Sequence, residues 1–163
     1  HPCLVKKDSY IGNVNGVMNA VIINGIPVGE SILQGEGAGP GPTSSALMSD
    51  LLSILRGNFK YPFGLPFLKR MKAKIYDIKN YSNSLYLRIE VKDKPGVLSQ
   101  ITKLLADRNI SVQRLLQIPN HKLKTASIVI ITHKSKELDA QKCLNLFKSN
   151  KNILKTPVLI RLL

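Results

Sequence analysis

The fold is decided by one stretch, Leu85-Tyr86-Leu87-Arg88-Ile89-Glu90-Val91-Lys92-Asp93-Lys94-Pro95-Gly96-Val97-Leu98. Its first eight residues alternate between apolar and other side chains, which is the period of a half-buried strand. Asp93-Lys94-Pro95-Gly96 interrupts the alternation with turn-forming residues. Apolar residues then return at helical spacing, so the stretch predicts a strand, a tight turn and a helix. The apolar positions of that helix are Val97, Leu98, Ile101, Leu104 and Leu105.

The residues that follow repeat this alternation of strands and helices. Asn109 closes the helix, because asparagine tolerates the left-handed conformation found at helix ends. Strands are then predicted near 110–118 and 126–132, the latter central, followed by a helix at 136–149 and a strand at 157–163. The order βαββαβ predicts an antiparallel four-stranded sheet with two helices on one face, the ferredoxin-like arrangement.

The first third of the chain has a different character, with many glycines and few charges. Strands are predicted at 17–23 and 28–34, joined by a tight turn at Asn24-Gly25. A glycine-rich loop at 35–43 leads into an amphipathic helix that Thr43 or Ser44 caps. The chain is therefore divided into residues 1–57, a Pro-rich and aromatic linker at 58–82, and a compact block at 83–163.

Charge and composition exclude several classes of protein. Lys and Arg number 24 against 10 Asp and Glu, a formal charge of +14, which can indicate binding to nucleic acid or to anionic membranes. Most of these bases are single lysines, and only 69–74 is dense, so we interpret them as a solvated surface. RNA-binding βαββαβ domains stack bases on aromatic side chains of the central strands, and 125–132 contains none. We therefore expect no nucleic-acid partner.

No apolar run approaches the roughly 18 residues needed to span a membrane, so no membrane segment is expected. The start, His1-Pro2-Cys3-Leu4, does not resemble a signal peptide, and we interpret it as a chain entered partway through. Cys3 and Cys143 are expected to be free thiols in a reducing cytoplasm. The three histidines have no ligand spacing, so no metal site is expected.

Two motifs can carry chemistry. The glycine loop between a strand and a helix is either a sharp turn or a place where backbone N–H groups meet a nucleotide or other anion. Its spacing, Gly-x-Gly-x-Gly-x-Gly, matches neither a P-loop nor the primary dinucleotide fingerprint. The turn before the helix at 97–105 is either a plain connection or a binding site for the carboxylate of a free amino acid. No catalytic set of residues is recognised.

Several segments of the first third form a set with a familiar order. They are His1-Pro2-Cys3-Leu4-Val5, Asp8, 16–21, 35–39, 42–46 and Asp50-Leu51. This set resembles the end of the catalytic domain of homoserine dehydrogenases, and 83–163 resembles the ACT domain that follows it in many bacterial members. The resemblance implies an α+β chain: a C-terminal ferredoxin-like ACT domain preceded by the end of an α/β catalytic domain.

The resemblance also implies an activity. The family interconverts L-homoserine and L-aspartate 4-semialdehyde with NAD or NADP, on the route to threonine, methionine and isoleucine. The cofactor is bound mainly by an N-terminal domain absent from this sequence, as are the catalytic lysine and the substrate-binding acids. The chain alone is therefore expected to be inactive and to hold no catalytic residue. Its expected cofactor contacts are Gly37, Ala38 and Gly39.

The sequence departs from the family pattern at Lys6, Ser9, Glu36 and Pro40. Pro40 matters most, because it removes one backbone donor from the loop.

ACT domains pair side by side through their sheets and bind amino acids at the interface, which implies a homo-oligomer with threonine as the effector. The expected effector contacts are Asp93, Pro95, Gly96, Val97, Leu98, Asn109, Ile110 and Ser111. The alternative is a free-standing ACT module that binds amino acids without catalysis.

Overall fold

The computed structural model describes all residues except 59–60, 62–63 and 73. The described residues form two units. One comprises Lys6–Lys74, and the other, larger unit comprises His1–Val5 together with Ile75–Leu163. None of the described helices is long and apolar enough to cross a membrane.

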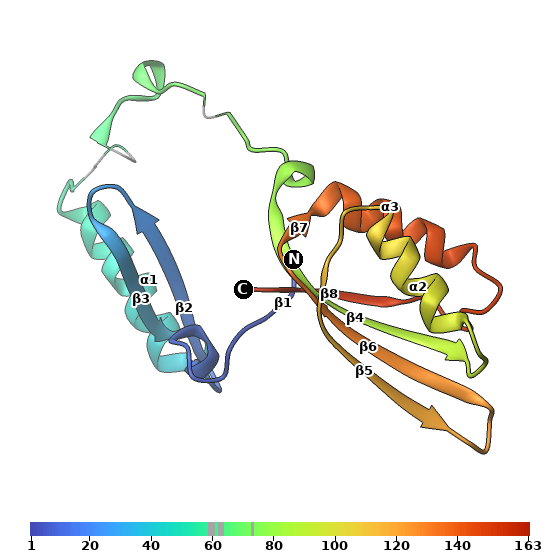
Figure 1. Ribbon diagram of the computed structural model, residues 1–163. Coiled ribbons are helices and arrows are strands. Elements are labelled where there is room, and N and C mark those ends of the chain that lie inside the picture. Colours follow the sequence, from blue (N-terminus) through green and yellow to red (C-terminus); the bar gives the residue numbers. More distant parts are fainter. Residues whose placement is uncertain (59–60, 62–63, 73) are drawn as a thin grey trace. The chain divides into compact units, whose positions relative to one another are not determined.

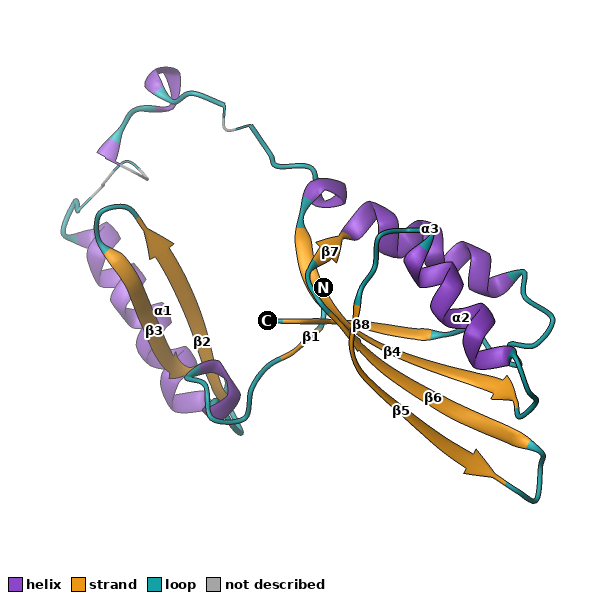
Figure 2. Ribbon diagram, viewed as in Figure 1, coloured by secondary structure: helices purple, strands orange, loops and turns teal. Residues whose placement is uncertain are grey.

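The larger unit contains a sheet with two helices on one face (Figures 1 and 2). Its four long strands lie in the order β8-β4-β6-β5, and all neighbours are antiparallel. The strands are β4 (Ser82–Lys92), β5 (Val112–Asn120), β6 (Thr125–Thr132) and β8 (Val158–Leu162), and the helices are α2 (Val97–Ala106) and α3 (Glu137–Lys148). This confirms the predicted ferredoxin-like βαββαβ fold, with β6 central.

Two short strands were not predicted. β1 (Cys3–Leu4) pairs in parallel with β8, and β7 (Ser135–Lys136) pairs with the start of β4. The N–H of Leu163 also donates to the carbonyl oxygen of Leu4 at 3.0 Å. Two residues are too few to show a period, so a strand of this length leaves no pattern in the sequence. The start of the chain thus belongs to the sheet of the larger unit.

The core lies between the sheet and the two helices. Every second residue of β4 and β6 is buried, as the alternating pattern predicts. The apolar side chains of α2 and α3, spaced about one helical turn apart, pack against these strand residues. The core residues are Leu87, Ile89, Val91, Val97, Ile101, Leu105, Ile110, Ala126, Ile128, Ile130, Cys143 and Phe147.

Both ends of α2 depend on left-handed backbone conformations. Gly96, at the N-cap, has φ of 83°, and Asn109, beyond the last turn, has φ of 55°. The N–H of Ile110 donates to the carbonyl of Leu105 at 3.0 Å, which satisfies a group left open at the helix end. The predicted role of Asn109 as the residue that closes the helix is confirmed.

The unit Lys6–Lys74 is a hairpin followed by a helix. Its elements are η1 (Ile11–Asn13), β2 (Met18–Gly25), β3 (Gly29–Glu36), α1 (Pro40–Leu55) and η3 (Phe67–Lys69). The two strands pair along their full length. None of the described residues of this unit is buried.

Two details of this unit were predicted wrongly. Asn24 and Gly25 lie within β2, and the turn is Ile26-Pro27-Val28, because Pro27 has no N–H with which to continue the ladder. Helix α1 begins at Pro40, before Thr43 and Ser44, with Gly39 as its N-cap and no side-chain cap. Proline at the first helical position loses no intrahelical bond, which explains the early start.

The two free cysteines should differ sharply in reactivity. Cys143 is 2% exposed, and burial raises the pKa of its thiol to about 11 from an ordinary 9.0. At pH 8 its reactive thiolate is therefore about 100-fold scarcer than that of an ordinary cysteine. We expect iodoacetamide to alkylate the half-buried Cys3 first and Cys143 only in denaturant, as mass spectrometry of the peptides will show. Equal labelling of both thiols in the folded chain would contradict the buried position of Cys143.

Candidate functional site

The turn between β4 and α2 opens into a pocket of about 420 Å³. Five of the eight predicted effector contacts line it, which are Asp93, Pro95, Gly96, Val97 and Leu98. Gln117 of β5 completes the wall. The structure thus brings together the turn residues that the sequence selected.

The backbone of this turn presents hydrogen-bond donors. The N–H of Val97 donates to the carbonyl of Lys94 at 3.3 Å. Within the described part of the chain, the N–H groups of Gly96, Leu98 and Ser99 have no acceptor. Open N–H groups at a helix start attract anions, since the helix dipole adds a partial positive charge there. The turn is therefore suited to a carboxylate.

The same pocket holds a negative charge. Asp93 Oδ1 accepts a hydrogen bond from Gln117 Nε2 at 3.3 Å, which ties the turn to β5. A carboxylate beside a set of open donors can receive an ammonium group while the donors receive a carboxylate. This arrangement suits a small zwitterion such as a free amino acid.

Three predicted contacts lie elsewhere. Asn109, Ile110 and Ser111 follow the C-terminal end of α2, whereas the pocket lies at its N-terminal end. A ten-residue helix is about 15 Å long, so one small ligand cannot reach both ends in the same chain. Ile110 is 3% exposed and belongs to the core. Ser111 accepts the N–H of His133 through its backbone carbonyl at 2.9 Å.

Sequence reasoning missed Gln117. It lies on β5 opposite Ile128 of β6, and this register turns its side chain toward the helix side of the sheet. Strand pairing alone brings it to Asp93, which is 24 positions away along the chain. No local pattern in the sequence carries that information.

Gly96 should matter to the stability of this turn through its backbone. An added Cβ would meet no atom within 4 Å, but φ of 83° is strained for other residues. We expect Gly96→Ala to lower the free energy of unfolding by about 1–2 kcal/mol in urea titrations. The matched control is Ser99→Ala, three residues further on, which should change it by less than about 0.5 kcal/mol. Equal effects of the two substitutions would contradict a backbone role for Gly96.

The predicted cofactor contacts form a short exposed segment between β3 and α1. The N–H of Gly37 donates to the carbonyl of Val17 at 2.8 Å, and a Cβ on Gly37 would collide with the side chain of Asn19. Gly39 has φ of 120°, a conformation that favours glycine. Both glycines are thus required by local geometry, and Ala38 lies exposed between them.

The start of α1 is poor in donors. Pro40 and Pro42 have no N–H, and the N–H of Thr43 donates to the carbonyl of Gly39 at 3.2 Å. Only Gly41 in the first turn keeps a donor for a ligand. The loop therefore suits a group that lies close against bare backbone better than it suits a phosphate.

A larger depression lies at the same end of the sheet, on the face away from the helices. It measures about 780 Å³ and is formed by the β5–β6 hairpin, Glu90 and Leu154-Lys155. It contains none of the predicted contacts and no helix start, so we place the candidate site at the β4–α2 turn. No group of His, Cys, Asp and Glu in the described ranges could hold a metal ion.

Known proteins match both parts of the chain. Residues 1–52 match the family described as homoserine dehydrogenase, and 85–150 match the ACT domain. Homoserine dehydrogenase of Neisseria gonorrhoeae is 39% identical over 84% of the chain, and that of Helicobacter pylori is 34% identical over 99%. The chain covers 33% and 38% of these two relatives, so it spans about a third of their length.

A solved structure agrees with these matches. A homoserine dehydrogenase from Thiobacillus denitrificans matches all of the chain with a TM-score of 0.84 and 29% identity, and 38% of that protein is covered. The two matches also occur in the order that the sequence predicted. The chain therefore belongs to the homoserine dehydrogenase family, and it contains the end of the catalytic domain followed by an ACT domain.

Proposed function

We propose that the whole protein is an NAD- or NADP-dependent homoserine dehydrogenase of the cytoplasm, which interconverts L-homoserine and L-aspartate 4-semialdehyde in threonine and methionine biosynthesis. The observation that carries this proposal is the match of residues 1–52 to the catalytic family, followed in the same chain by an ACT domain at 85–150. A free-standing ACT module would not include the first of these matches. The relatives with 39% and 34% identity bear the same enzyme name.

This chain contributes a surface for the cofactor. The nicotinamide cofactor supplies or accepts the hydride when it is bound. Gly37, Ala38 and Gly39 would lie against it, since their exposed backbone allows close approach and a side chain on Gly37 has no room. Their role would be to orient the cofactor and exclude water from it.

The unit Lys6–Lys74 supports the proposal that further protein completes this site. Its described residues include none that are buried, and α1 exposes large apolar side chains along its length. Exposed apolar surface of this extent is normally covered by other protein. The exposed residues of α1 are Leu47, Met48, Leu51, Leu52, Ile54 and Leu55.

We therefore expect no turnover by this chain alone. The assay follows NADPH or NADH absorbance with L-aspartate 4-semialdehyde, and a full-length relative serves as the positive control. Oxidation of either cofactor by the purified chain would contradict our assignment of the catalytic groups to the remainder of the protein.

We further propose that the ACT domain binds a free amino acid, with threonine as the effector. Asp93 would receive the ammonium group, and the N–H groups of Gly96 and Leu98 would receive the carboxylate. β5 lies at the edge of the sheet, so a second copy can pair there. Asn109, Ile110 and Ser111 could then reach the ligand only from that second copy.

Titration calorimetry of the whole chain tests this proposal. We expect L-threonine to bind, and Asp93→Ala to weaken binding by about tenfold or more, because a charged partner is lost. The matched control is Glu90→Gln, an acid near the end of β4, three residues before Asp93, that lines the other depression. Light scattering with and without threonine reports the pairing of copies. Absence of binding by threonine and by every other amino acid would refute the sensing role.

A further inference from the structure

The unit Lys6–Lys74 is joined to the larger unit at two places. At Val5-Lys6 the chain leaves β1, which is paired with β8. At Lys74-Ile75 it returns and passes through η4 (Ile78–Asn80) into β4, and η4 lies against α3. Any mechanical connection between the units through the backbone must use one of these two segments.

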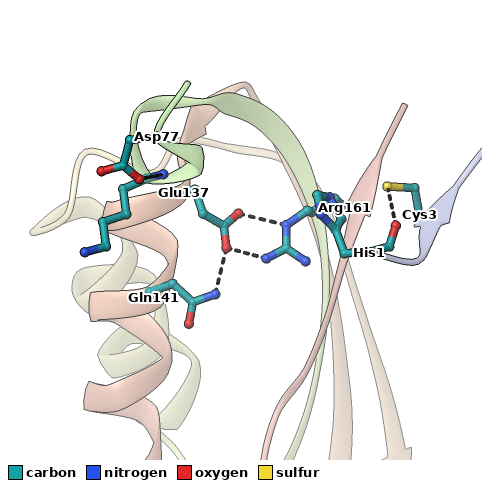
Figure 3. A network of polar contacts seen from close by, with 7 residues as sticks. His1, Cys3, Asp77, Glu137, Gln141 and Arg161 are labelled. Carbon is teal, nitrogen blue, oxygen red and sulfur yellow. Dashed lines mark hydrogen bonds and ion pairs between the residues drawn. The ribbon is translucent and has the colours of Figure 1, made fainter. Parts of the chain in front are cut away.

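One ion pair lies where β8 and α3 meet (Figure 3). Arg161 of β8 donates from Nε to Glu137 Oε2 at 2.8 Å, and its Nη2 donates to Oε1. Gln141 Nε2 also donates to Glu137 Oε1, at 2.7 Å. The side chains are 5% exposed for Glu137 and 16% for Arg161. Within the described ranges this is the only ion pair.

The surroundings of Glu137 favour its charged form. The Arg161 guanidinium, with help from Gln141, holds the pKa of the carboxyl below its ordinary value although burial acts in the opposite direction. The pair is therefore ionised and bidentate at neutral pH, which fixes both distance and orientation.

Each partner of the ion pair also holds one of the two connecting segments. Arg161 lies beside Cys3 of β1 and opposite Leu85 of β4 in the register of the sheet. The backbone N–H of Glu137 donates to the carbonyl of Tyr81 at 2.9 Å, directly after η4. Asp77 caps η4 by accepting the N–H of Lys79 at 3.0 Å, so this segment is ordered up to the contact.

We propose that Glu137 and Arg161 form a coupling node, a single buried ion pair that holds both backbone connections between the ACT domain and the unit Lys6–Lys74. A two-residue strand cannot remain docked by its own hydrogen bonds, so β1 depends on a fixed β8. β8 in turn is fixed to α3 by Arg161. If α3 or β8 changed position, β1 and the segment at 75–81 would therefore come loose together.

The coupling node goes beyond the proposed function, because it assigns the path by which the state of the ACT domain reaches the rest of the chain. It concerns contacts within this chain and does not depend on which amino acid binds. An experiment that finds no threonine binding would therefore leave the coupling node standing, and an experiment that disproves the node would leave threonine binding standing.

Hydrogen exchange of the whole chain, read by mass spectrometry of peptides, tests the node. In Glu137→Gln we expect residues 1–5, 75–81 and 158–163 to lose at least about tenfold more protection than β4 and β6, whose amides fall only by the loss of global stability that urea unfolding measures. Amides that follow β1, around η1, should also exchange faster. The matched control is Asp139→Asn, which removes an acid from the same helix turn without touching Arg161.

Two results would overturn the node. One is loss of protection in β8 and α3 alone, with residues 1–5 and 75–81 unchanged. The other is a uniform loss that includes β4 and β6, which would make the pair a general stabiliser. If Glu137→Gln does not fold, Arg161→Lys keeps the charge but loses the bidentate geometry, and the same two patterns decide the question.

Discussion

Replacing Phe147 with alanine is expected to destabilise the larger unit by about 3–5 kcal/mol, the largest effect of any single truncation that we anticipate. Phe147 is 0% exposed and lies on α3 in the same core cluster as residues of α2 and all of the central strands. Removal of the ring leaves a cavity whose walls come from two helices and a sheet. The helices and the sheet cannot all move into the cavity without losing their own packing and strand hydrogen bonds, so the cavity persists.

Urea unfolding followed by circular dichroism measures this effect. The matched control is Leu138→Ala, on the same helix but 37% exposed, which should cost less than about 1 kcal/mol. A domain of this size is stable by only about 5–15 kcal/mol, so Phe147→Ala should be partly unfolded well below the wild-type midpoint. A loss no larger than that of Leu138→Ala would show that α3 does not pack as described.

The sequence predicted the parts of the fold in which burial alternates with a fixed period. In β4 and β6 one face meets the helices, so Leu87, Ile89, Ile128 and Ile130 stand out at every second position. β5 was harder to delimit, since its side chains are almost all exposed and its ladder contains a register shift between Val112 and Arg114. β1 escaped detection because two residues show no period and its partner lies at the opposite end of the chain.

The same distinction applies to the candidate site. The turn at Asp93–Leu98 could be selected from sequence, because turn residues and a helix start coincide there. Gln117 could not, because only the β5–β6 register brings it to Asp93. The separation of Asn109, Ile110 and Ser111 from that turn follows from the length of α2, and it leaves their contact with an effector dependent on a second copy.

The second large effect is expected at Glu137 and depends on pH. The Arg161 hydrogen bonds lower the pKa of Glu137 in the folded protein below the ordinary 4.5. A lowered folded pKa means that the unfolded chain takes up the proton more readily, so acid favours unfolding. The stabilisation is therefore complete at neutral pH, begins to fade near pH 4.5 and is lost as pH falls through the folded pKa.

Glu137→Gln isolates this contribution. At pH 7 the substitution leaves Arg161 buried without a counter-charge, and we expect a loss of about 3 kcal/mol, near the lower end for buried pairs because Arg161 keeps some exposure. As pH falls below 4.5, the unfolded wild-type chain takes up the proton first, and at lower pH the folded carboxyl is protonated too and resembles the amide. The difference in the free energy of unfolding between the two proteins should therefore shrink steadily. Urea unfolding at pH 7, 5, 4 and 3 measures this difference. The control is Glu90→Gln, whose free energy of unfolding should stay close to that of the wild type at every pH. A difference between wild type and Glu137→Gln that is independent of pH would mean that the two side chains are not ion-paired in the folded protein.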